Sequence, residues 1–98
     1  MTHPISHVNS FAIVAPYTIR VVFDDDTAQT IYFRPVLAGE LFGPLKDLEL
    51  FNQVRLDHEV KTLVWPNGAD FDPAMLHDWT EHAEAMAERA RRWEQGAA

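Results

Sequence analysis

The sequence contains no cysteine among its 98 residues. This absence excludes disulfide bridges, zinc sites built from thiolates and thiol catalysis, so any chemistry must rest on oxygen and imidazole groups. Basic residues are also scarce, because 8 Lys and Arg stand against 15 Asp and Glu and give a formal charge of −7. A chain with so few cations releases few counterions from phosphates, and its composition therefore disfavours nucleic-acid binding.

Long apolar runs are missing as well. No stretch reaches the about 18 apolar residues that a membrane-spanning helix needs. A secretory signal begins with Lys or Arg followed by an apolar run. The first residues, Met1 to Pro4, do not show this pattern. We therefore expect a cytoplasmic protein without a membrane segment. With 47% hydrophobic residues and three Trp, the sequence predicts one folded domain over residues 1–98.

The first half of the chain alternates between apolar and polar residues, which is typical of half-buried strands. The clearest face comprises Tyr17, Ile19, Val21 and Phe23. The pattern predicts strands over residues 8–14, 17–23 and 29–33, separated by Pro16 and by a turn at residues 24–26. Such short connections favour an antiparallel meander. Residues 54–56 and 62–65 predict a second hairpin, and residues 35–52 predict short helical turns and loop.

The last third of the sequence predicts one long amphipathic helix over residues 73–95. Asp72 is a good N-cap, and Pro73 suits the first helical position because its missing N–H is not needed there. The apolar positions repeat at spacings of three and four and form one stripe: Leu76, Trp79, Ala83, Met86, Ala90 and Trp93. The predicted fold is α+β, with a sheet-containing module over residues 5–72 followed by this helix.

A more specific pattern accompanies these elements. It comprises Tyr17, Phe23, the pairs Leu41-Phe42 and Pro44-Leu45, Phe51 and above all the run Trp65-Pro66-Asn67-Gly68-Ala69-Asp70-Phe71-Asp72-Pro73. Over residues 5–78 the chain resembles the short prokaryotic proteins grouped as domain of unknown function 2442. The resemblance implies a small α/β fold and no catalytic residue. Some relatives continue into a helix-turn-helix domain, and others are encoded beside a small protein in an arrangement that looks like a toxin–antitoxin pair.

No set of residues in the sequence forms a catalytic motif, so we predict no catalytic residue, cofactor or metal. Ser6 and Ser10 lie outside a nucleophile elbow, and no phosphate-binding glycine loop occurs. Asp70 and Asp72 with His77 or His82 would suit a metal-assisted hydrolase, which is the enzymatic alternative. Against it, Asp72 suits a helix cap and Asp70 a turn. His77 and His82 are five residues apart, so they lack the spacing of a helical zinc motif.

The best remaining hypothesis is a non-enzymatic protein-interaction module. A helix of this length overruns a small sheet, so its distal residues Met86, Ala90 and Trp93 need another surface, either on the same chain or on a partner. If a partner covers them, these residues, with Arg89 and Arg92 beside them, are the predicted interface. The partner would be another protein or a second copy in a homodimer, and the chain would be the acidic, antitoxin-like member of a two-component pair. Three arginines, at positions 89, 91 and 92, also allow a DNA-linked regulator, although cations in this place suit the end of a helix.

Overall fold

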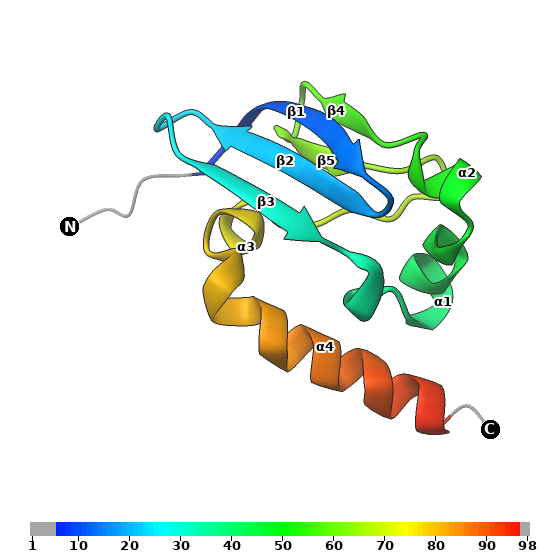
Figure 1. Cartoon of the computed structure of the whole chain (residues 1–98). Coiled ribbons are helices and arrows are strands. Elements are labelled where there is room, and N and C mark those ends of the chain that lie inside the picture. Colours follow the sequence, from blue (N-terminus) through cyan, green and yellow to red (C-terminus); the bar gives the residue numbers. More distant parts are fainter. Residues whose placement is uncertain (1–5, 97–98) are drawn as a thin grey trace.

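The computed structural model describes residues 6–96, and its first half is an antiparallel meander (Figure 1). Strands β1 (Val8–Ala15), β2 (Thr18–Phe23) and β3 (Ala28–Tyr32) form a three-stranded sheet in the order β1-β2-β3. Tyr17 at the first turn and Asp26 at the second have positive φ values of 58° and 67°. The three strands and their order confirm the prediction from the alternation, with bounds that differ by one residue.

The two faces of this sheet differ sharply. Ile19, Val21, Phe23 and Ile31 are at most 1% exposed and face the core. The opposite face carries rows of residues that the pairing places side by side, and its central row is Ala12, Arg20 and Thr30. The meander is therefore a sheet with one buried face and one solvent-exposed face, as antiparallel sheets commonly are.

The middle of the chain consists of short helices, as the mixed spacing predicts. They are η1 (Arg34–Val36), α1 (Gly39–Phe42), η2 (Gly43–Lys46) and α2 (Leu48–Phe51). Strands β4 (Arg55–Asp57) and β5 (Thr62–Val64) then form the predicted second hairpin. Leu63 of β5 and Trp65 directly after it are buried in the same core as the inner face of the meander.

Aromatic rings hold the core together, and Phe33 lies at their centre. Its fully buried ring has four aromatic neighbours at centroid distances between 5.2 and 6.1 Å: Phe51, Trp65, Phe71 and Trp79. These rings come from α2, from the segment after β5 and from the start of the last helix. Phe33, directly after β3, therefore connects the sheet with α2, with the segment after β5 and with the start of the last helix.

The C-terminal helix is interrupted, whereas the sequence predicts one continuous helix over residues 73–95. Helix α3 (Pro73–His77) ends at Asp78, whose φ and ψ are −101° and 31°, and α4 (Trp79–Gly96) follows at once. Asp is a weak helix former because its side chain competes for local hydrogen bonds, and here the carboxylate contacts the ring of His77. The break places Leu76 and Trp79 in the core, where they are 0% and 7% exposed.

Helix α4 extends below the sheet in Figure 1 and packs mainly on the middle segment, against η1 and α1. An ion pair between Lys46 and Glu94 ties its end to η2, and the ammonium group holds the pKa of Glu94 below its ordinary value. The distal part of this helix is therefore covered in part by the chain's own middle segment. Of the helices described, none combines the length and the apolar character that crossing a bilayer requires.

Candidate functional site

The segment 65–73 folds as a turn that closes the core. Trp65 is 2% exposed, and its indole Nε1–H donates to the carbonyl oxygen of Phe51 at 2.9 Å. Pro66 lies on the surface, and Gly68 has a φ of +89°, a conformation that glycine adopts at little cost. The N–H of Gly68 donates back to the carbonyl oxygen of Trp65. Trp65 is therefore a core residue.

Asn67 joins this turn to the middle of the chain. Its side-chain N–H donates to the carbonyl oxygen of Leu41 at 2.8 Å, and its Oδ1 accepts from the N–H of Ala69 at 3.2 Å. The hydroxyl of Thr62, a buried polar side chain, donates to the carbonyl oxygen of Phe71 at 2.6 Å. Apart from the exposed Asp70, the polar side chains here serve a turn, a cap or a loop contact. The contacts therefore give the segment a structural role.

Asp72 is the N-cap of α3, as the sequence predicts. Its Oδ1 accepts from the N–H of Ala74 at 2.9 Å. We expect Asp72→Ala to lower the free energy of unfolding by about 1 kcal/mol, because an unpaired N–H remains at the helix start. Urea unfolding followed by circular dichroism measures the change. Asp70→Ala is the matched control, since Asp70 is exposed and makes no side-chain hydrogen bond within the described residues; an equal loss in both variants would contradict the capping role.

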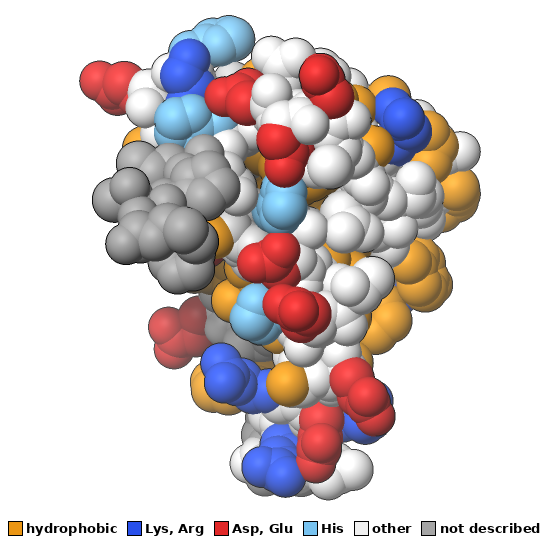
Figure 2. All heavy atoms as spheres, turned by 90° about the vertical axis from the view of Figure 1, so that its left-hand side faces the viewer, with side chains coloured by type: hydrophobic (Ala, Val, Ile, Leu, Met, Phe, Trp, Pro, Cys, Tyr) orange, Lys and Arg blue, Asp and Glu red, His pale blue; other side chains and the backbone are white. Residues whose placement is uncertain are grey.

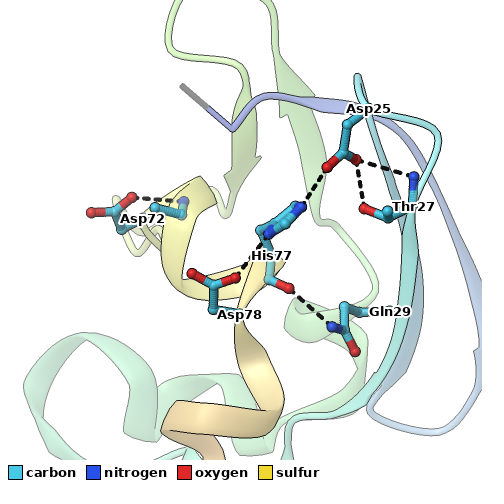
Figure 3. A network of polar contacts seen from close by, with 7 residues as sticks. Asp25, Thr27, Gln29, Asp72, His77 and Asp78 are labelled. Atoms are coloured by element: carbon cyan, nitrogen blue, oxygen red, sulfur yellow. Dashed lines mark hydrogen bonds and ion pairs between the residues drawn. The ribbon is translucent and has the colours of Figure 1, made fainter. Parts of the chain in front are cut away.

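Acidic and histidine side chains form a column down one side of the molecule (Figure 2). On this side, His77 at the end of α3 reaches the turn between β2 and β3 (Figure 3). Its Nε2 lies 2.7 Å from a carboxylate oxygen of Asp25, and its Nδ1 lies 2.9 Å from one of Asp78. The carbonyl oxygen of His77 accepts from the side chain of Gln29 at 2.9 Å. We call Asp25, His77 and Asp78 the histidine clamp.

The geometry of the histidine clamp favours a charged imidazole. Carboxylates only accept hydrogen bonds, so both ring nitrogens must donate to satisfy both contacts, and only the protonated ring can do this. The bonds to Asp78 and Asp25 accordingly raise the pKa of His77 above its ordinary 6.5. The pKa of Asp25 falls to about 2, because its carboxylate accepts from Thr27 and from His77. The clamp therefore joins the β2–β3 turn to the helices by charge.

A group of potential metal ligands lies directly beside the clamp. The ligand atoms of Asp78, Glu81 and His82 lie within 4.8 Å of one another, which makes them the group in the described chain that could hold a divalent cation. The predicted set of Asp70 and Asp72 with His77 or His82 does not assemble there. Asp72 caps α3 and both ring nitrogens of His77 contact carboxylates, so these groups are engaged elsewhere.

A groove lies between the η1–α1 segment and the C-terminal half of α4. Its hollow of about 180 Å³ has one wall formed by Val36 and Phe42, and another formed by Met86, Arg89, Ala90 and Trp93. Of the predicted interface residues, Ala90 is buried at 8% exposure, Met86 is half-buried, and Trp93 remains 53% exposed. The distal stripe is thus covered in part by the chain's own middle segment, and Trp93 is left open at the groove.

Two of the three arginines of α4, Arg89 and Arg92, line a second hollow together with Glu88. Arg92 pairs with Glu88 at 2.8 Å, the contact that the spacing of four residues predicts. Arg89 lines the groove, while Arg91 and Arg92 do not. A phosphate-binding surface would need several free cations side by side, so this arrangement gives the DNA-linked alternative little support.

Sequence reasoning missed two features of this region. The bond between His77 and Asp25 joins residues 52 positions apart, so no pattern of neighbouring residues could predict it. The helical spacing instead suggests pairs of His77 with Glu81 and of Asp78 with His82, of which the second recurs in the ligand group. The groove was missed because its wall of Val36 and Phe42 comes from short helices that have no regular periodicity.

One comparison with known proteins confirms the family resemblance noted over residues 5–78. No curated protein and no solved structure matches the chain. The sequence model described as protein of unknown function DUF2442 matches residues 8–82, which include the whole meander, the second hairpin and the histidine clamp. The chain therefore belongs to the DUF2442 family.

Proposed function

We propose that this protein is a non-enzymatic protein-interaction module that binds a partner protein through the groove between α1 and α4. The observation that carries the proposal is Trp93, a large aromatic side chain that is 53% exposed beside an apolar hollow. Tryptophan is enriched among the residues that dominate binding energies at protein interfaces. Burial of its free half by a partner would remove apolar surface from water.

The size of the groove supports a protein partner over a small-molecule substrate. Pockets for drug-sized ligands measure about 300–1,000 Å³, whereas this hollow measures about 180 Å³. A single large apolar side chain suits the smaller volume. Arg89 is the charged residue of the lining, and its guanidinium could donate to a carbonyl or carboxylate oxygen beside that side chain.

The charge of the chain suggests the nature of the partner. A formal charge of −7 attracts basic proteins at long range and repels acidic ones. The partner we propose is therefore a basic protein that inserts one apolar side chain into the groove. This is the relation expected if the chain is the acidic, antitoxin-like member of a two-component pair.

The test replaces Trp93 with glutamate. We expect Trp93→Glu to weaken partner binding at least about 30-fold, because it removes the apolar contact and places a charge at the groove. Immobilised chain would capture the partner from a native extract, and titration with that purified partner would give the affinities. Gln95→Glu is the matched control, since it adds the same charge at an exposed position of α4 outside the groove. A partner that binds both variants equally would contradict the proposal.

A further inference from the structure

We propose that Asn67-Gly68 is a modification site, at which the side-chain amide of Asn67 deamidates to a carboxylate when the turn of segment 65–73 opens. In the closed turn, hydrogen bonds engage every group that takes part in the reaction. Neither residue lines the groove between α1 and α4, so the inference does not rest on the function proposed above.

The reaction needs only water and the chain itself. The backbone nitrogen of Gly68 attacks Cγ of Asn67, and the new C–N bond closes a succinimide ring. The proton of the attacking N–H passes through solvent to the amide nitrogen Nδ2, which leaves as ammonia. Water then breaks one of the two C–N bonds of the ring: cleavage at Cγ leaves aspartate, and cleavage at the backbone carbonyl carbon leaves isoaspartate. Glycine hinders the attack least, because it has no Cβ.

The closed turn blocks this reaction at each of its groups. The N–H of Gly68 donates to the carbonyl oxygen of Trp65 at 3.0 Å, so the attacking nitrogen keeps its proton. The leaving amide nitrogen of Asn67 donates to the carbonyl oxygen of Leu41 at 2.8 Å. Its Oδ1 accepts from the N–H of Ala69 at 3.2 Å. Ring closure turns the amide away from both partners, so the turn has to open before the ring forms.

Opening the turn costs free energy, because the core holds it on both sides. Trp65 and Ala69 are 2% and 0% exposed, and the N–H of Trp65 donates to the carbonyl oxygen of Ala69 at 2.9 Å. Between them, Asn67 is half-buried and Gly68 is exposed, so solvent is at hand once the turn opens. The rate of deamidation therefore follows the fraction of molecules in which this turn is open.

Deamidation weakens the turn in which it occurs. A carboxylate has no N–H, so the aspartate product loses the bond to the carbonyl oxygen of Leu41 and places two acceptors against each other. The isoaspartate product adds an atom to the backbone between Trp65 and Ala69, whose backbone groups bond across the turn. Both products favour the open turn, and the lost ammonia makes the change irreversible. The site thus converts a transient opening into a lasting loss of stability.

Peptide mass spectrometry tests the site, with the chain incubated folded and in guanidinium chloride at the same mildly alkaline pH. In the denaturant, Asn67 should deamidate faster than Asn9 and Asn52, because the residues that follow those two carry a Cβ. In the folded chain, Asn67 should deamidate at least about tenfold more slowly than in the denaturant, because only the open fraction reacts. Equal rates in the two states, or an unfolded Asn67 that reacts no faster than the other two, would overturn the inference.

Asn67→Asp tests the effect of the aspartate product on the fold. We expect it to lower Tm by about 4 °C, because the bond to the carbonyl oxygen of Leu41 is lost. Asn9→Asp is the matched control, since it makes the same change at an exposed position of β1 and should leave Tm nearly unaltered. Equal Tm values for the two variants would show that the amide of Asn67 does not hold the turn.

Discussion

Replacing Phe33 with alanine is expected to lower the free energy of unfolding by about 3–5 kcal/mol, the largest effect of any change considered for this protein. The ring is fully buried and has four aromatic neighbours, so its removal leaves a cavity at the point where the sheet meets the helices. A domain of this size has a total stability of about 5–15 kcal/mol. The variant should therefore be close to unfolding at room temperature.

Thermal unfolding followed by circular dichroism measures this effect as a fall in Tm of more than about 12 °C. Val60→Ala serves as the control, because Val60 is 55% exposed and its truncation removes little buried surface. A surface change of this kind should alter stability by no more than about 0.5 kcal/mol. Similar losses in the two variants would show that Phe33 is not the centre of the core.

Replacing His77 with phenylalanine is expected to lower Tm by several degrees at mildly acidic pH and to remove part of the pH dependence of stability. Phenylalanine keeps an aromatic ring beside Phe23, whose centroid lies 5.0 Å from that of His77. It removes both nitrogens of the histidine clamp, so Asp25 and Asp78 lose their shared cationic partner. The loss should be modest because both carboxylates are about half exposed.

The direction of the pH effect follows from the two pKa shifts. The pKa of His77 is raised above its ordinary 6.5, so the clamp stabilises the fold fully below pH 6.5 and loses this contribution as the pH rises through the raised value. The pKa of Asp25 is lowered from 3.8 to about 2, so its contribution is present above pH 3.8 and is lost as the pH falls toward about 2. Between these limits both contributions are complete.

Melting curves recorded from about pH 5 to about pH 9 separate the clamp from other groups. The unaltered chain should lose stability over the upper part of this range, and His77→Phe should lose less. His58→Phe is the control, because His58 is exposed in the turn between β4 and β5 and contacts no carboxylate by hydrogen bond or ion pair in the described chain. Parallel curves for the unaltered chain and His77→Phe would show that the clamp makes no contribution.

Much of the candidate site was readable from local patterns. Asp72 was identified as a helix cap from its place before Pro73, and Trp79 was assigned to the apolar face of the helix from its spacing. Capping and periodicity depend on residues within one or two turns of one another, so the sequence alone records them. The break at Asp78 was missed, because the stripe of apolar residues continues across it without interruption.

The sequence by itself determined the α+β class, the meander and its turns, the second hairpin and the amphipathic character of the last helix. Each depends on alternation, on turn residues or on helical spacing over a few neighbouring positions. Only the tertiary structure decided that His77 meets Asp25, that η1 and α1 cover part of α4, and that Trp93 stays open beside a hollow. These contacts join segments far apart in the chain, and they depend on strand register and helix direction, which packing of the whole core sets at once.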